Sequence, residues 1–116
     1  TVIGCGGDRD KMKRPEMASI AVRFSDKVIL TSDNPRSEDP EAIIKDMMAG
    51  VKEEETEKVF RITNRKEAIR MACALATGKD VVLVAGKGHE KYQEINGKRW
   101  PFDDLQELKA VLLKDI

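Results

Sequence analysis

Short apolar runs alternate with apolar residues at helical spacing along most of the chain. The apolar runs that predict strands are 1–3, 28–30, 59–62 and 81–84, and VVLV at 81–84 is the strongest of them. The segments with apolar residues three and four positions apart predict helices over 15–24, 40–51 and 64–77. An alternation of strands and helices favours a mostly parallel sheet with flanking helices. We therefore expect an α/β fold.

Residues that begin or end helices refine these predictions. Asp39 before Pro40 is typical of a helix start, and Gly50 suits a left-handed cap at the end of the same helix. In the helix that opens at Pro15, the residues expected to face the sheet are Met17, Ile20, Ala21 and Phe24.

A β-hairpin and a final helix are predicted in the C-terminal part. Asn96-Gly97 readily takes the positive dihedrals of a tight turn, so we expect Tyr92–Ile95 to pair with Lys98–Phe102. Asp103 then caps a helix with one apolar face, formed by Leu105, Leu108, Val111 and Leu112.

Composition limits the classes of function. The 116 residues, of which 41% are hydrophobic, fit one small domain, and the balance of 21 basic and 21 acidic residues gives no broad basic surface for nucleic acid or an anionic membrane. Cys5 and Cys73 lack the spacing of a zinc or redox site, so we expect free thiols with at least partial burial. The chain has no apolar run of bilayer length, and our expectation is a cytoplasmic protein.

Polar loops follow strand-like runs at three places, and their sequences are GCGGDRD from Gly4, SDNPR from Ser32 and AGKGHE from Ala85. Loops after parallel strands emerge at one edge of the sheet, where such folds bind ligands. This arrangement would bring Arg9, Arg36 and Glu90 around one site. Arginine pairs with carboxylates and a carboxylate accepts from an ammonium, so an amino acid is the natural ligand.

Each loop also has a simpler interpretation. Glycines are used wherever a chain turns sharply, and GCGGDRD fails the dinucleotide fingerprint because Arg9 stands where its third glycine belongs. DNPR could be an ordinary turn before a helix. GKGHE lacks the spacing of a nucleotide-phosphate loop, and its His89 is better explained as a structural residue than as a general base.

Longer versions of these motifs resemble the C-terminal domain of the Mur ligases, and most closely its diaminopimelate-adding branch. They are GCGGDRDKMKRP from Gly4, TSDNPRSEDPEAI from Thr31 and VLVAGKGHE from Val82. The resemblance implies a Rossmann-like domain over residues 1–116, the last part of a three-domain ligase of peptidoglycan synthesis. Such an enzyme uses ATP and Mg²⁺, bound mainly outside this domain, to join meso-diaminopimelate to UDP-MurNAc-L-Ala-D-Glu. The resemblance implies no catalytic residue and no metal ligand within residues 1–116, so this domain alone should be inactive.

By the same resemblance, the diaminopimelate site would comprise Arg9, Asp33, Asn34, Pro35, Arg36, Gly86 and Glu90. Arg36 and Asn34 would bind the distal carboxylate, while the Gly86 carbonyl and the Glu90 carboxylate would accept from the distal ammonium. The family usually has glycine where this chain has Met12 and Ala18, and a positive dihedral at Met12 would reshape the loop that presents Arg9. We expect Lys11 and Lys13 to be solvated.

Two other functions stay open from the sequence. A lysine-adding ligase of the same family would share the architecture, although DNPR favours diaminopimelate because its arginine would be left unpaired by lysine. A free-standing α/β module that binds a small zwitterionic or anionic molecule would need no chemistry at all.

Overall fold

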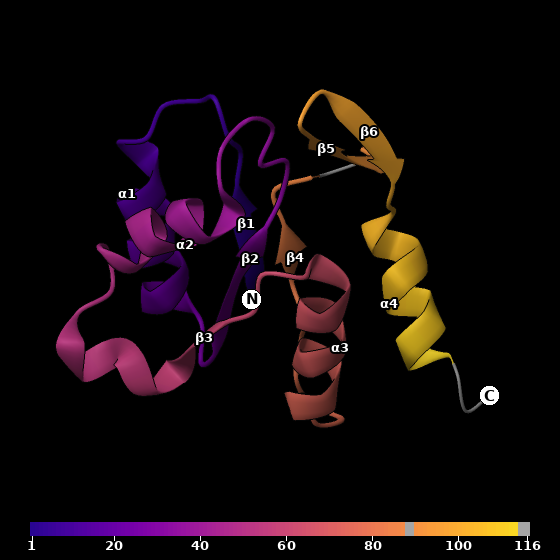
Figure 1. The fold of residues 1–116 in the computed structure, drawn as a ribbon. Helices are drawn as coiled ribbons and strands as arrows, with labels where there is room; N and C mark the ends of the chain where they lie inside the picture. The colour runs from indigo at the N-terminus through magenta and orange to yellow at the C-terminus, as the bar shows by residue number, and fades with distance from the viewer. Residues whose placement is uncertain (88–89, 114–116) are drawn as a thin grey trace.

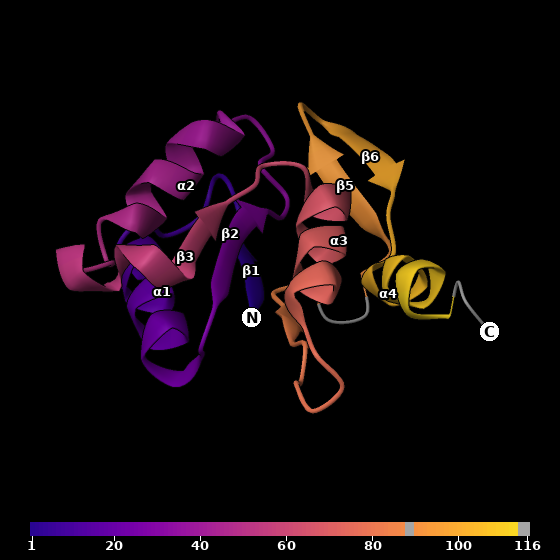
Figure 2. The ribbon, with the colours of Figure 1, turned by 90° about the horizontal axis from the view of Figure 1, so that it is seen from below.

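The computed structural model describes residues 1–87 and 90–113 and has a parallel sheet between two layers of helices (Figure 1, Figure 2). The four-stranded sheet has the order β3-β2-β1-β4, and every pair in it is parallel. The elements are β1 (Val2–Cys5), α1 (Lys13–Phe24), β2 (Val28–Ser32), α2 (Pro40–Met48), the 3₁₀ helix η1 (Glu53–Lys58), β3 (Val59–Arg61), α3 (Arg65–Leu75), β4 (Val84–Ala85), β5 (Tyr92–Ile95), β6 (Lys98–Pro101) and α4 (Asp104–Leu112). The predicted α/β class is confirmed.

Side chains of the central strands alternate between two cores. Ile3, Cys5 and Leu30 belong to the core under α1 and α2, whereas Val2 and Ile29 belong to the core under α3 and α4. In the parallel register, Val2 lies opposite Ile29 and Ile3 lies opposite Leu30. The two residues of each pair therefore point to the same face of the sheet. Burial on both faces explains why these strands are continuous apolar runs.

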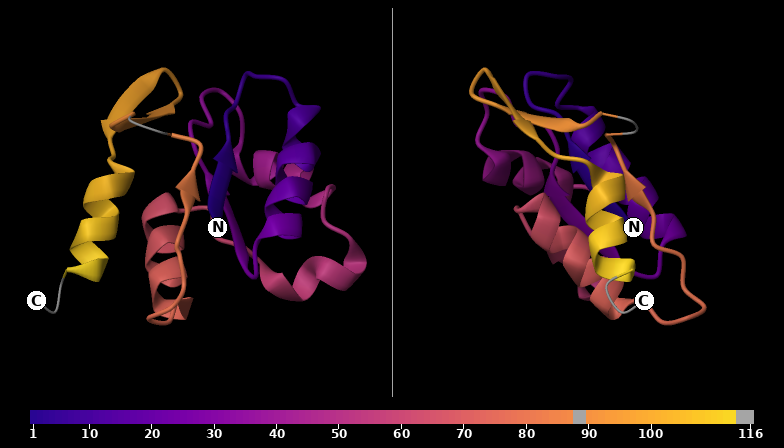
Figure 3. Two further views of the ribbon diagram at one scale, coloured as in Figure 1. Left: turned by 180° about the vertical axis from the view of Figure 1, so that it is seen from behind. Right: turned by 90° about the vertical axis from the view of Figure 1, so that its right-hand side faces the viewer.

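The predicted hairpin is present as a separate two-stranded antiparallel sheet, β5-β6. Its turn has φ 49° at Asn96 and 79° at Gly97, as the Asn-Gly pair predicts. The hairpin is held through the DNPR loop, because the Arg36 N–H donates to Glu94 O over 2.9 Å and the Asn96 N–H donates to Arg36 O over 2.8 Å. Figure 3 shows the hairpin and α4 beyond the edge of the main sheet.

Helix starts follow the predicted capping residues. Asp39 accepts from the Glu41 N–H at the start of α2, and Asp103 accepts from the Leu105 N–H at the start of α4, both over 3.0 Å. In each case a short carboxylate satisfies a backbone donor that the first turn leaves free.

The predicted buried face of α1 is only partly right. Ile20 and Phe24 are 51% and 77% exposed, while Ala18 and Val22 are fully buried. The helix begins at Lys13, two residues earlier than predicted, and turns Arg14 into the interior, where acidic side chains bind it. Small residues therefore face the sheet. Met12 has φ −67°, so the methionine strains nothing.

The strand predicted at 81–84 is much shorter than expected. Only Val84 and Ala85 form β4, and Val81 and Leu83 are 90% and 56% exposed. This strand lies at the end of the sheet, where it pairs with β1 alone. Val81 and Leu83 are therefore apolar residues that the fold leaves exposed.

Gly50 does not form the predicted left-handed cap. Positive φ angles among the described glycines occur at Gly86 and Gly97, and the residue that ends α2, Ala49, is right-handed. A Cβ at Gly50 would lie 1.8 Å from the backbone oxygen of Pro15. Glycine is needed here because the chain after α2 touches the first turn of α1.

We predict that Gly50→Ala lowers the free energy of unfolding by about 2 kcal/mol or more, because a methyl group must push α1 away from α2. Gly78→Ala is the matched control, since a Cβ at Gly78 would meet nothing within 4 Å. Urea unfolding of both variants measures the effect. Equal stability of the two variants would contradict this account.

Candidate functional site

The loops after β1, β2 and β4 lie side by side at the carboxyl edge of the sheet. The Gly7 N–H donates to Asn34 O over 2.7 Å, which joins the first loop to the second. Gly86 has φ 113°, and a Cβ there would lie 3.3 Å from Gly4 O and 3.7 Å from Asp33 Oδ2. The loop after β4 therefore touches the other two.

Arg36 is held in an uncommon backbone conformation next to the first loop. Its φ is 54°, and its Nη1 donates to Gly7 O over 2.9 Å. Gly7 allows this approach because a Cβ there would lie 1.8 Å from Pro35 O. The Arg36 Nε also lies 3.8 Å from Glu94 Oε2, so the hairpin provides a negative charge beside the guanidinium.

Arg9 and Arg36 flank the same glycine. A Cβ at Gly6 would lie 2.8 Å from Arg36 Nη1 and 3.6 Å from Arg9 Cγ. Arg9 is exposed, and its Nη1 donates to Asp8 O over 3.1 Å. The Arg36 guanidinium and the Arg9 side chain thus both border Gly6, and a guanidinium group can bind an anionic group such as a carboxylate.

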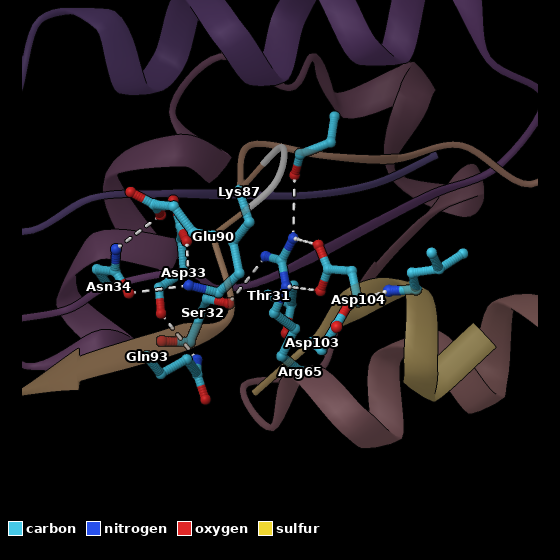
Figure 4. Close-up of polar contacts among 12 residues, drawn as sticks. Thr31, Ser32, Asp33, Asn34, Arg65, Lys87, Glu90, Gln93, Asp103 and Asp104 are labelled. Atoms are coloured by element: carbon cyan, nitrogen blue, oxygen red, sulfur yellow. Dashed lines mark hydrogen bonds and ion pairs between the residues drawn. The ribbon is translucent and has the colours of Figure 1, made fainter. Parts of the chain in front are cut away.

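Asn34 and Glu90 are in direct contact (Figure 4). The Asn34 Nδ2 donates to Glu90 Oε1 over 3.2 Å, and the Tyr92 hydroxyl lies 3.4 Å from Glu90 Oε2. Asn34 is buried and Glu90 is half-buried. The Glu90 carboxylate is thus held between an amide and a phenol and can accept hydrogen bonds from a cation.

Lys87 lies beneath these residues with a fully buried side chain. Its Nζ donates to Asn34 Oδ1 over 2.8 Å and to Tyr92 O over 2.7 Å, and it lies 2.9 Å from Asp33 Oδ1. Figure 4 shows the ammonium between Asp33 and Asn34. The Lys87 ammonium is thus bound by protein oxygens of three residues.

A second buried cation, Arg65 at the start of α3, joins the strand ends to α4. Its Nε and Nη2 each donate to the Asp104 carboxylate over 2.8 Å. Its remaining donors reach Ser32 O and Ala85 O, both over 3.2 Å. This one guanidinium satisfies carbonyls at the ends of β2 and β4 (Figure 4).

Arg14 is a third buried cation, and it binds a carbonyl of the first loop together with acidic side chains. It donates to both oxygens of Glu38, over 3.1 and 2.7 Å, to Asp46 Oδ2 over 2.9 Å and to Gly6 O over 3.1 Å. The hydrogen bond from Arg14, together with that from the Asp8 N–H, lowers the pKa of Glu38 to about 2. The same pairing with Glu38 raises the pKa of Arg14.

The residues predicted for the site fall into two neighbouring groups. Arg9 and Arg36 flank Gly6, whereas Asn34, Gly86 and Glu90 lie with the loop after β4. Asp33 and Pro35 face inward, toward Lys87 and Gly7 respectively. His89 lies outside the described residues.

The buried cations Arg14, Arg65 and Lys87 were not predicted from the sequence. For two of them the available signal was their position in the motifs, since Lys87 lies within AGKGHE and Arg14 ends KMKR before Pro15, whereas Arg65 lies in none of the motifs. Spacing alone does not separate them from solvated residues such as Lys11, whose side chain is 70% exposed.

The remaining chemistry of the described residues is modest. Cys5 and Cys73 are free thiols, as predicted, and burial raises the pKa of Cys5 to about 11. Within residues 1–87 and 90–113, no three His, Cys, Asp or Glu residues form a possible metal site. In the same part of the chain, none of the helices combines the length and apolarity of a membrane span.

A family model described as "Mur ligase, glutamate ligase domain" matches residues 1–88. The chain belongs to this family. This match confirms the resemblance of the three sequence motifs to the Mur ligases.

Proteins with similar sequences are much longer than this chain. Proteins of Phocaeicola vulgatus and Cytophaga hutchinsonii, both named UDP-N-acetylmuramoyl-L-alanyl-D-glutamate--2,6-diaminopimelate ligase, are 59% and 57% identical over 115 and 112 residues. A solved structure of a ligase with this name has a TM-score of 0.91 and 49% identity, and the match covers 97% of this chain. The chain covers 24%, 23% and 23% of these three proteins, about a quarter of their length.

We predict that the Arg14–Glu38 pair stabilises the Mur ligase domain above the ordinary carboxyl pKa of 4.5 and that this contribution disappears as the pH falls toward about 2. Stability falls as the pH falls, because the Glu38 carboxylate takes up a proton at a higher pH in the unfolded chain than in the folded chain. Glu38→Gln should therefore be less stable than wild type at about pH 6, and the difference should shrink at about pH 3 in urea unfolding.

The exposed Glu57 supplies the control, because Glu57→Gln should follow wild type at both pH values. A gap between wild type and Glu38→Gln that is as wide in acid as near neutrality would argue against the pairing.

Proposed function

We propose that residues 1–116 form the C-terminal, amino-acid-binding domain of a longer, three-domain ligase that adds meso-diaminopimelate to UDP-MurNAc-L-Ala-D-Glu. The names of the similar proteins support this substrate pair. The observation that carries the proposal is the meeting of the three motif loops, with the side chains of Arg9 and Arg36 at Gly6 and the contact between Asn34 and Glu90.

We assign complementary charges to the two parts of the site. Arg36, with Asn34 and Arg9, binds carboxylate groups of diaminopimelate, because a guanidinium fork matches a carboxylate. The Gly86 carbonyl and the Glu90 carboxylate accept from the ammonium at the distal end. Asp33 and Pro35 set the shape of the loop, since Asp33 is paired with Lys87 and Pro35 O lies against Gly7.

ATP and Mg²⁺ belong, in this proposal, mainly to the parts of the ligase outside residues 1–116. The lysine of AGKGHE is already bound to Asn34, Tyr92 and Asp33, so this loop offers no phosphate cradle. ATP would activate the glutamate carboxyl group, and the domain described here would hold the amine that attacks it. Such a reaction consumes ATP, and we propose that it takes place in the cytoplasm, without nucleic acid or membrane partners.

The experiment that tests the function is a ligation assay of the longer protein with meso-diaminopimelate and lysine in parallel. Incorporation of diaminopimelate in preference to lysine is the expected result. Preference for lysine would support the lysine-adding alternative, and binding without ligation would favour a binding module.

We predict that Arg36→Ala in the longer protein lowers kcat/KM for diaminopimelate about 100-fold, because a carboxylate loses its charged partner. The KM for ATP should stay unchanged. Arg70→Ala is the control, since the Arg70 side chain is 53% exposed and pairs with the neighbouring Glu67. Wild-type rates with Arg36→Ala would refute the assignment.

We also predict that residues 1–116, prepared alone, form no amide product from ATP, diaminopimelate and the nucleotide substrate. The reason is that the phosphate-binding groups are proposed to lie elsewhere. Product analysis after long incubation, with the longer protein as the positive control, tests this. Any amide product formed by the separate domain would contradict the proposal that ATP binds mainly outside residues 1–116.

A further inference from the structure

The side-chain amide of Asn34 has one chemically allowed orientation. Its Oδ1 receives two donors, Lys87 Nζ over 2.8 Å and the Glu94 backbone N–H over 2.9 Å. An ammonium and a backbone N–H can only donate, so the atom that faces them must be the carbonyl oxygen. The NH₂ group is thereby turned the other way.

The orientation of Asn34 in turn determines that of Glu90. The Asn34 Nδ2 donates to Glu90 Oε1 over 3.2 Å, and Asn34 as a residue is 2% exposed. A reversed amide would place two oxygens against each other and repel the carboxylate. Figure 4 shows Lys87, Asn34 and Glu90 following one another in this chain of contacts.

The position of Lys87 is itself determined by its surroundings. Its side chain is 0% exposed, and Asp33 Oδ1 makes no hydrogen bond of its own, so the ion pair with Lys87 is what compensates the burial of that oxygen. A buried charge is tolerated when its donors are satisfied and an opposite charge is near. Lys87 meets both conditions, because its Nζ donates to Asn34 Oδ1 and Tyr92 O and forms an ion pair with Asp33 Oδ1.

We propose that Lys87 is a positioning residue for amino-acid selection, acting through Asn34 to aim the Glu90 carboxylate at the ammonium of the substrate. This inference rests on the proposed function. It assigns a role to the lysine of AGKGHE that involves no contact with phosphate or with the substrate. Loss of Lys87 should weaken the capture of diaminopimelate and leave the chemistry of ATP intact.

The test uses Lys87→Met in the longer protein. The KM for diaminopimelate should rise about tenfold, the effect of one misaligned hydrogen bond to a charged group, while the KM for ATP stays constant and kcat changes less. Lys87→Gln keeps a donor for Asn34 Oδ1 and should recover part of the affinity. An unchanged KM for diaminopimelate in Lys87→Met would overturn the proposal.

A stability control separates positioning from damage to the fold. Val22→Ala removes buried volume from the core under α1, away from the three loops, and should lower the melting temperature without changing the KM for diaminopimelate. If Val22→Ala and Lys87→Met raise this KM equally, the effect of Lys87 is merely structural and the proposal fails.

A measurement without substrate distinguishes failure of this inference from failure of the proposed function. In protein labelled with ¹⁵N-asparagine, Lys87→Met should shift the Asn34 side-chain NH₂ signals and speed their exchange with water. If wild type ligates no diaminopimelate, the proposed function fails, but these signals still test the link between Lys87 and Asn34. Unchanged Asn34 signals would overturn that link in either case.

Discussion

Buried cations at the carboxyl edge of the sheet are the constraint on which the three loops depend. Arg14, Arg65 and Lys87 come from different elements, and each donates to oxygens of a loop or strand end. Taking a charge out of water costs several kcal/mol, and it is tolerated here because every cation also meets a carboxylate. The loops are therefore attached from the inside, and their outer surface remains available for a ligand.

The same cations connect distant parts of the Mur ligase domain. Arg65 joins strand ends to α4 through Asp104, and Lys87 joins the DNPR loop to the hairpin through Tyr92 O. The hairpin and α4 lie outside the main sheet, yet they reach the site through these bonds (Figure 1). The C-terminal part thus contributes to the site by holding residues of other elements in place.

Local patterns predicted much of this architecture. Asp39, Asp103 and the Asn96-Gly97 pair act within a few residues of themselves, so their roles follow from the sequence. The roles of Gly50 and of the residues before β4 depend on which segment lies alongside, and no local pattern contains that information. For the site, motif position indicated which loops meet. The burial of a lysine between them follows only from the tertiary arrangement.

The exposed residues before β4 have a practical consequence. β4 is an edge strand of the sheet, and among the described strands it pairs with β1 alone. Val81 and Leu83, which precede it, are exposed to solvent. An open strand edge with uncovered aliphatic groups is a template for intermolecular pairing. A charged residue in place of Val81 would interrupt this apolar surface and make such pairing less favourable.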